Sequence, residues 1–152
     1  MTAPAPARPW HRFWPAHVPR SLDYPSAPAW WLLERNLPRF ADRLAVLELD
    51  PATLEEGRRL TYDELWRAAR GVATGLARLG VTAGTRIGLC LPNSAELIIG
   101  YYATWCAGGV VVPANPAGRE SEIAEQLGDA GVALVLGVAG GGAEQAAARL
   151  AV

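Results

Sequence analysis

The glycine-rich segment 137–142, GVAGGG, is the part of this chain whose composition comes closest to a phosphate-binding loop. It lies between an apolar run expected to form a strand and a segment expected to form a helix, where phosphate loops occur. The spacing does not fit Gly-x-Gly-x-x-Gly, because counting from Gly140 and Gly142 places Gln145 at the third position. A loop ending in Lys-Ser/Thr is excluded, because all 14 basic residues are arginines. A surface turn is the favoured interpretation, and a small nucleotide-binding domain is the weakest alternative.

Acidic, histidine and cysteine side chains are the other candidates for chemistry. Four carboxylates follow one another on one expected helix: Glu120, Glu122, Glu125 and Asp129. We expect a solvated helix face there, since acidic residues near a helix N-terminus suit its dipole. His11 and His17 lie six residues apart in a proline-rich segment and form a poor metal site. Cys90 and Cys106 lie in apolar stretches and are expected to be reduced core residues.

No residue set indicates an active site. Both histidines lie near the N-terminus, so no Ser-His-Asp or Cys-His arrangement is expected. The absence of lysine also excludes a lysine nucleophile or a Schiff base within this chain. The sequence therefore assigns no catalytic, cofactor-binding or metal-binding residue, and whether the chain acts as an enzyme is left open at this point.

The composition is typical of one globular domain. The chain has 152 residues, of which 51% are hydrophobic and 19% charged, with a formal net charge of −1. This balance argues against disorder, and the lack of a basic cluster argues against a nucleic-acid partner. No apolar leader segment is visible at the N-terminus, so we expect no secretory signal and a cytoplasmic location.

An uncharged stretch at 97–118 is long enough to span a bilayer. The pair Gly108-Gly109, together with Pro113 and Pro116, interrupts it. Because lipid leaves no partners for an interrupted backbone, a helix followed by a buried strand is the better interpretation. No transmembrane segment is predicted.

Residues 1–28 are predicted to form an extended arm, because repeated prolines disfavour helices and central strands. We expect Trp10, Phe13 and Trp14 to pack it against the folded body, and the alternative is a docking peptide for a partner. Residues 29–152 form the predicted domain. Its first element is a helix over 29–40, with Trp30, Leu33 and Leu37 on one face and Pro38 ending or kinking it.

A strand at 44–49, a turn and a short strand at 58–60 precede the clearest local signal in the sequence. Thr61 and Glu64 form a capping box at the start of a helix predicted over 61–79. Gly80 supplies the left-handed cap at its end. The expected apolar face of this helix consists of Leu65, Ala69, Val72, Leu76 and Leu79.

From Thr85 onward, strands and helices alternate. The strands are expected at 85–91, 110–114 and 132–137, and the helices at 93–107, 119–131 and 143–152. This order predicts an α/β fold, a partial doubly wound parallel sheet with right-handed crossovers. The runs VVV and VALVL are apolar throughout, which is typical of strands buried on both faces.

Several segments together resemble the AMP-forming acyl-CoA synthetases of the adenylate-forming superfamily. SLDYP (21–25), LLERN (32–36) and FADRLAV (40–46) are similar to the opening of medium- and long-chain fatty acid–CoA ligases. LTYDEL (60–65) resembles the first core motif of the superfamily. GTRIGLCLPNSAELIIGYYATWCAGGVVVPANP (84–116) resembles the run through its second, with Gly109 where that motif carries alanine. The resemblance covers about residues 20–136.

The resemblance implies the N-terminal portion of an ATP-dependent fatty acid–CoA ligase and an incomplete subdomain. In that family a carboxylate attacks Mg-ATP to form an acyl-adenylate and pyrophosphate, and the thiol of CoA then displaces AMP. The resemblance implies ATP, Mg²⁺ and CoA for a full-length enzyme and a fatty or other carboxylic acid as substrate. It assigns none of these ligands to the present residues, so the chain alone is expected to be inactive. A non-catalytic α/β module that binds a protein partner, including the rest of such an enzyme, is the alternative.

Overall fold

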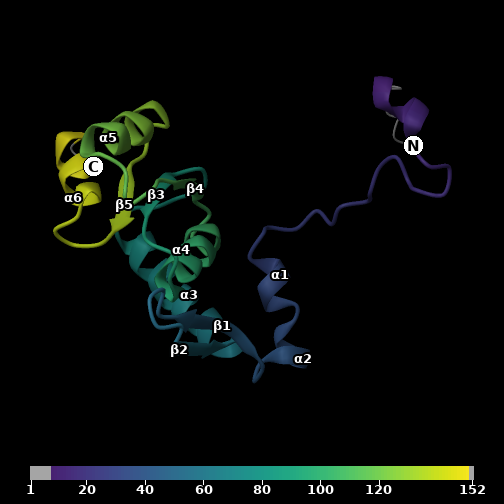
Figure 1. The fold of residues 1–152 in the computed structure, drawn as a ribbon, viewed down its shortest axis with the longest axis horizontal. Helices are drawn as coiled ribbons and strands as arrows, with labels where there is room; N and C mark the ends of the chain where they lie inside the picture. The colour runs from purple at the N-terminus through teal and green to yellow at the C-terminus, as the bar shows by residue number, and fades with distance from the viewer. Residues whose placement is uncertain (1–7, 151–152) are drawn as a thin grey trace.

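The computed structural model describes residues 8–150, which form an α/β body preceded by an arm that extends away from it (Figure 1). In chain order the elements are a 3₁₀ turn (Pro9–Phe13), α1 (Trp31–Glu34), α2 (Leu37–Phe40), β1 (Leu44–Leu49), β2 (Glu56–Thr61), α3 (Tyr62–Arg78), β3 (Arg86–Cys90), α4 (Ala95–Cys106), β4 (Val110–Pro113), α5 (Glu120–Asp129), β5 (Leu134–Gly137) and α6 (Gly142–Leu150). The predicted alternation from β3 to α6 is confirmed. Residues 1–7 of the expected arm and 151–152 of the last expected helix lie outside the described residues.

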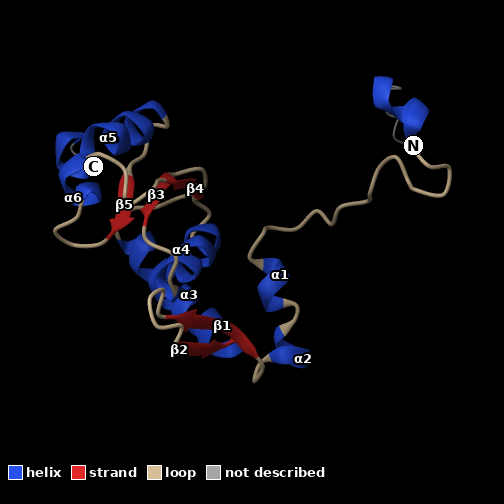
Figure 2. Cartoon of the chain, viewed as in Figure 1, coloured by secondary structure: helices blue, strands red, loops and turns tan. Residues whose placement is uncertain are grey.

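The strands form two separate sheets (Figure 2). β1 and β2 form an antiparallel hairpin, and the other strands form a parallel sheet in the order β4-β3-β5. In the parallel sheet Ile87 lies opposite Val111 on one side and Leu134 on the other. Helix α4 makes the crossover from β3 to its neighbour β4, and α5 connects β4 to β5 on the other side of β3. The predicted α/β class and the parallel sheet are therefore confirmed.

The expectation that VVV and VALVL are buried on both faces is wrong. Val110 of β4 is 47% exposed, and Val111, Leu134 and Leu136 are only half-buried. The reason is the strand order: these strands are the two outer strands, and β3 alone is flanked on both sides. An outer strand leaves one row of backbone groups and part of each face open. The described sheet is accordingly incomplete.

The predicted capping box of α3 is present. The Thr61 hydroxyl accepts a hydrogen bond from the Glu64 N–H at 3.2 Å, and the Glu64 carboxylate accepts one from the Thr61 N–H at 2.8 Å. Gly80 follows the helix with φ of +90°, the left-handed conformation expected of a terminating glycine. These local interactions fix both ends of α3 (Tyr62–Arg78).

The predicted apolar face of α3 is confirmed at Leu65, Ala69 and Leu76, which are buried, and is wrong at two positions. Val72 is 38% exposed and Leu79 is 71% exposed, whereas Trp66 and Ala73 are buried. The physical reason is that the large ring of Trp66 packs inward against α1. The buried positions then follow a helical repeat through 66, 69, 73 and 76, and Leu79 lies beyond the last full turn.

The helix predicted over 29–40 is interrupted. It forms α1 (Trp31–Glu34) and α2 (Leu37–Phe40), and Pro38 lies in the first turn of α2. Proline is accepted there because the first N–H groups of a helix have no intrahelical acceptor. Leu33 is buried, and Trp30 packs on Trp66 with ring centroids 6.1 Å apart.

The arm does not pack on the body as expected. Trp10 is 52% exposed, Phe13 75% and Trp14 40%. The described arm residues instead contact one another. The Trp14 indole N–H donates a hydrogen bond to the Val18 carbonyl at 3.0 Å. The guanidinium of Arg12 also lies 4.5 Å from the centre of the Phe13 ring. The arm over residues 8–28 is therefore locally ordered but separate from the core (Figure 1).

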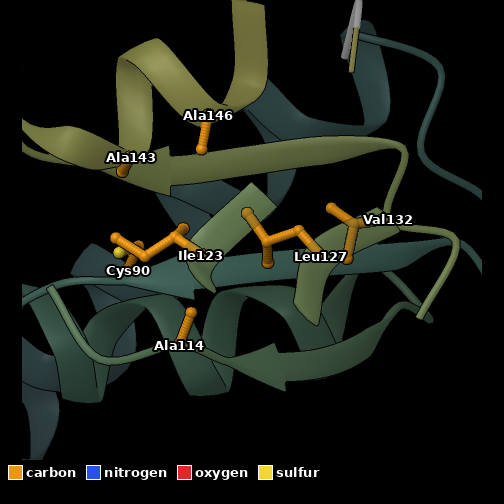
Figure 3. Close-up of a cluster of buried hydrophobic side chains, with 7 residues drawn as sticks. All are labelled: Cys90, Ala114, Ile123, Leu127, Val132, Ala143 and Ala146. Carbon is orange, nitrogen blue, oxygen red and sulfur yellow. The ribbon is translucent and has the colours of Figure 1, made fainter. Parts of the chain in front are cut away.

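Helices α5 and α6 cover one face of the parallel sheet. Ile123 and Leu127 of α5 point toward Cys90 and Val132 and are almost completely buried (Figure 3). Ala146 of α6 packs against the same cluster. Within residues 8–150, none of the helices has the length and hydropathy needed to cross a bilayer. The uncharged stretch forms α4 followed by β4, as predicted.

Candidate functional site

The carboxyl ends of β3 and β5 border a small apolar cavity. In open parallel sheets ligands bind at this edge, so it is the first place to look for a site. The cavity has a volume of about 300 Å³. Its lining residues come from the loops that follow the three strands and from the start of α6: Cys90, Pro92, Pro116, Ala117, Val138, Gly141, Gly142 and Ala143. None of these lining residues is charged, so the cavity offers no charged side chain to a ligand.

Polar side chains near this edge form hydrogen bonds with backbone groups of nearby residues. The Asn115 side-chain oxygen accepts a hydrogen bond from the Ala117 N–H at 3.0 Å. The Gln126 amide donates to the Pro113 carbonyl at 2.8 Å, which ties α5 to the end of β4. The Ser94 hydroxyl accepts from the Leu97 N–H and caps α4. Each of these three groups is engaged with a backbone group of the chain and so shapes this edge of the sheet.

The glycine-rich loop carries its own carboxylate. Gly140 adopts a φ of +75° and donates its N–H to the Glu144 carboxylate at 2.5 Å. A carboxylate at the start of α6 is stabilised by the helix dipole and repels a phosphate at the same position. The geometry therefore favours the interpretation of 137–142 as a turn over the nucleotide-binding alternative.

The four acidic residues of α5 lie at the surface, as predicted. Glu122 accepts a hydrogen bond from the Arg119 N–H at 3.1 Å and so caps the helix. Glu120 forms an ion pair with Arg149 of α6 at 3.2 Å. The remaining two acids of this helix are exposed. This face stabilises the α5–α6 pair and offers no acid–base couple.

Both cysteines are free thiols in the described structure. Cys90 is buried, and burial raises the pKa of its thiol. Cys106 is half-buried, and desolvation likewise raises the pKa of its thiol. A raised pKa keeps a thiol protonated, which makes a poor nucleophile. The structure brings neither cysteine next to a histidine, and among the described residues no three His, Cys, Asp or Glu side chains are grouped for a metal ion.

An acidic groove between the β1–β2 hairpin and the start of α4 was not predicted. It has a volume of about 730 Å³ and is lined by four acidic residues, Glu48, Asp50, Glu55 and Glu56, together with apolar residues that include Leu47, Leu49 and Ile98. The Glu56 carboxylate forms an ion pair with Arg59, and the Asp50 carboxylate accepts hydrogen bonds from the Ala52 and Thr53 N–H groups. The hairpin is attached to α4 in two places. The Glu48 carboxylate accepts a hydrogen bond from the Ala95 N–H, and Arg58 forms an ion pair with Glu96.

Little in the sequence indicates this groove. The one available signal is Glu48, a charged residue within the otherwise apolar strand LAVLEL. The Glu48 carboxylate accepts its hydrogen bond from the N–H of Ala95, which lies 47 residues further along the chain at the start of α4. This contact exists only in the tertiary fold. The described structure places neither a histidine nor a cysteine among the residues that line the groove.

Known proteins resemble this chain in sequence and fold. The family profile described as AMP-binding enzyme matches residues 33–151. The long-chain-fatty-acid–CoA ligase of Bacillus subtilis is 31% identical over 129 residues, which are 85% of this chain and 22% of that protein. A linear gramicidin synthase of Brevibacillus parabrevis is 34% identical over 128 residues, which are 84% of this chain and 2% of that protein.

Comparison with solved structures indicates the same family as the sequence comparison. The N-terminal subdomain of Klebsiella oxytoca NpsA, solved in complex with anthranilyl-AMSN, superposes with a TM-score of 0.64 at 27% identity, covering 72% of this chain and 27% of that one. The chain thus spans about a quarter or less of each of these relatives. The resemblance and the incomplete, N-terminal subdomain expected from the sequence are confirmed. Because the family profile covers more than half of the sequence, the chain belongs to the AMP-binding enzyme family.

Proposed function

We propose that this chain is the N-terminal scaffold of an ATP-dependent ligase that joins a fatty acid to coenzyme A. The observation that carries the proposal is the 31% identity with a long-chain-fatty-acid–CoA ligase over 129 residues. The SLDYP segment at 21–25 resembles the opening of medium- and long-chain fatty acid–CoA ligases, and this resemblance also favours a fatty acid over an amino acid as the substrate. In the proposed reaction the fatty acid carboxylate attacks the α-phosphate of ATP and releases pyrophosphate. The CoA thiolate then attacks the acyl carbon and releases AMP.

The described residues do not fit the ATP, Mg²⁺ and CoA that this reaction needs. The glycine-rich loop is closed by Glu144, and the cavity at the carboxyl edge is apolar. No chemical step is therefore assigned to a residue of this chain. Its proposed contribution is the parallel sheet β4-β3-β5 with α5 and α6 packed on it, a rigid layer against which a catalytic layer can be positioned. We also propose that residues 1–28 form a separate arm and 29–152 the domain portion.

A chimaera tests the scaffold role. Residues 29–150 replace the corresponding segment of the Bacillus subtilis ligase, and acyl-CoA formation is measured with palmitate, ATP and CoA. We expect the chimaera to retain activity within about tenfold of the parent and the isolated chain to have none. A Gly137→Val version is the matched control, because a Cβ at this position would lie 2.8 Å from the Ala143 Cβ and push α6 off the sheet. A folded chimaera without activity would contradict the proposal.

The substrate class needs a separate assay, because the chimaera carries the acyl pocket of its host. The complete gene product that contains this chain is assayed for pyrophosphate release with palmitate, octanoate, anthranilate and single amino acids. We expect the fatty acids to give at least tenfold higher kcat/KM than the others. A preference for an amino acid or an aryl acid would remove the fatty acid assignment and leave the scaffold role unaffected. A cytoplasmic location, where ATP and CoA are available and thiols stay reduced, is part of the same proposal.

A partner-binding module is the second candidate, and the open outer strands favour it. β4 and β5 each pair on one side only within the described sheet, and Val110 is 47% exposed. A sheet edge of this kind pairs readily with another chain. An isolated chain that unfolds cooperatively as a stable monomer would support an independent module. A chain that folds only when co-expressed with the remainder of the enzyme would support the scaffold of a ligase.

A further inference from the structure

A pocket between α1 and α3 lies outside the regions described above and has a volume of about 480 Å³. Its lining residues come from α3, from α1 with its N-cap, and from the end of α4: Trp66, Arg70, Ala73, Thr74 and Ala77, then Trp30 and Glu34, then Cys106 and Ala107. Helix α1 ends at Glu34 after four residues, and α3 carries alanines at 73 and 77. Neither helix therefore fills the space beside Trp66.

Aromatic rings and negative charge meet in this pocket. Trp30 and Trp66 line it with ring centroids 6.1 Å apart, and indole attracts cations more strongly than the other aromatic rings. The Glu34 carboxylate lines the same pocket. Helix α4 ends at Cys106, so the negative end of its dipole borders the pocket as well. These features favour a cation.

The lining offers few acceptors for the N–H groups of a primary ammonium. Guanidinium and indole groups only donate hydrogen bonds. The Thr74 hydroxyl already donates to the Arg70 carbonyl at 2.9 Å. A quaternary ammonium suits such a lining, because it has no N–H group to satisfy and is attracted to the faces of aromatic rings.

Arg70 brings the opposite charge to the same pocket. Its guanidinium carbon lies 6.0 Å from the centre of the Trp66 ring, at the outer limit of a cation–π contact. Among the described residues, neither Arg70 nor Glu34 belongs to an ion pair. Both charges act on the Cys106 thiol, whose pKa is raised by burial, lowered by Arg70 and raised by Glu34. One ligand that carries an anion and a cation can therefore pair with both.

We propose that this pocket binds a betaine, a small zwitterion with a quaternary ammonium and a carboxylate. The ammonium lies against the indoles of Trp30 and Trp66 and beside Glu34, and the carboxylate accepts hydrogen bonds from Arg70. A simple cation would meet the charge of Arg70, and a simple anion would meet that of Glu34, so a ligand with both charges is favoured over either. The pocket shares no lining residue with the cavity at the carboxyl ends of the strands.

Three ligands of related shape test the pocket by isothermal titration calorimetry on the whole chain. Glycine betaine carries both charges, and choline carries the quaternary ammonium alone. The third ligand, 3,3-dimethylbutanoate, has the shape of betaine with carbon in place of nitrogen and carries the carboxylate alone. Arg70→Gln and Glu34→Gln each remove one charge from the pocket. Arg78→Gln is the matched control, because this arginine is exposed on α3 and lies outside the pocket.

The parent chain should bind glycine betaine with a dissociation constant below about 5 mM. It should bind the other two ligands at least about tenfold more weakly, because each makes one charged contact in place of two. Arg70→Gln should weaken betaine binding at least about tenfold without weakening choline binding. Glu34→Gln should weaken betaine binding by a similar factor without weakening 3,3-dimethylbutanoate binding. Arg78→Gln should bind all three ligands as the parent does, and circular dichroism checks that each variant is folded.

The Cys106 thiol reports where the ligand binds, because it lines the pocket. Modification by N-ethylmaleimide is followed by mass spectrometry with and without glycine betaine. Betaine at a concentration that saturates the parent should slow modification of Cys106 in the parent and leave it unchanged in the Arg70→Gln variant. Cys90 is buried and lies outside the pocket, so it is the internal reference.

Three results would overturn the proposal. The first is the absence of saturable betaine binding up to about 5 mM. The second is equal affinity for glycine betaine and 3,3-dimethylbutanoate, which would show that no cation is recognised. The third is betaine binding that neither charge variant weakens or that does not slow modification of Cys106, which would place the ligand elsewhere. None of these measurements involves ATP or CoA, so their outcome is independent of the proposed function.

Discussion

Gly109 lies between α4 and β4, at the position where the motif it resembles carries alanine, and its replacement by alanine tests the packing of this turn. A Cβ at this position would lie 3.0 Å from the Thr104 Cγ2 and 3.1 Å from the Thr85 carbonyl oxygen. It would also lie 3.2 Å from the Thr104 carbonyl oxygen. The two carbonyls accept hydrogen bonds from Val110 and Gly109, each at 2.8 Å. The neighbours can therefore move only by stretching these bonds.

The two opposing effects of Gly109→Ala differ in size. Reduced freedom of the unfolded chain stabilises by about 0.4–1 kcal/mol when the native conformation accepts a Cβ. Overpacking in a tight site costs about 1–3 kcal/mol. With three contacts of 3.2 Å or less, overpacking dominates, and we expect a net loss of about 1–2 kcal/mol. With a urea m-value of about 2 kcal/mol/M, the unfolding midpoint falls by about 0.5–1 M.

A double-mutant cycle with Thr104→Ser identifies the contact responsible. Serine removes the Cγ2 methyl and keeps the hydroxyl, so Gly109→Ala should cost at least about 0.5 kcal/mol less in that background, as is typical of coupled neighbours. Gly71→Ala is the matched control, because a Cβ there meets nothing within 4 Å in α3 and should stabilise by about 0.5–1 kcal/mol. An unfolding midpoint that Gly109→Ala leaves unchanged or raises would show that overpacking does not dominate at this turn. An equal cost in both backgrounds would show that the Thr104 methyl is not the obstacle.

Four further predictions concern groups whose environment is equally defined. Thr104→Val should raise the free energy of unfolding, measured by urea titration, by about 1–3 kcal/mol. The Thr104 hydroxyl is buried without a hydrogen-bond partner among the described residues, so its desolvation is uncompensated. A lower free energy of unfolding would show that the hydroxyl is hydrogen-bonded. Thr61→Ala should lower stability by about 0.5–2 kcal/mol in the same urea titration by removing the cap of α3, and an unchanged midpoint would show that the cap contributes nothing. Hydrogen bonds from Thr61 lower the pKa of Glu64 below the usual range of a glutamate, so the stabilisation from Glu64 is present above that range and is lost as the pH falls through the lowered pKa. A Glu64→Gln variant should therefore show a weaker loss of stability as the pH falls below about 5, and an unchanged pH profile would contradict this linkage. Cys90 should react with iodoacetamide only on unfolding, since its thiol is buried with a raised pKa, and mass spectrometry that finds it labelled in the native chain would refute its burial.

Local interactions explain which elements could be predicted from sequence. The cap of α3 involves residues three positions apart, Thr61 and Glu64, and the alternation from β3 to α6 follows from apolar runs separated by amphipathic ones. The burial of VVV was predicted wrongly because an apolar run does not reveal whether its strand has one neighbour or two. Packing of the arm was predicted wrongly because aromatic content does not specify the surface that receives it.

The acidic groove was missed for a related reason. Its walls come from the hairpin and from the start of α4, and Glu48 reaches the Ala95 N–H across 47 residues of sequence. No local pattern relates a glutamate in a strand to a helix start so far along the chain. Sites assembled across such a distance become visible only when the tertiary fold is known.

The motifs that carry the family resemblance serve packing in this structure. Thr61 of LTYDEL caps α3, and Gly109 of GGVVVP lies where a side chain would meet two carbonyl oxygens. Gly108 adopts a φ of +80°, and a Cβ placed on it would lie 3.3 Å from the Ala83 Cα, so it too is required by backbone geometry. Such constraints depend on how helices cross a sheet and not on which acid is activated. A chain can therefore be assigned to the AMP-binding enzyme family by residues whose role in the described structure is capping and packing.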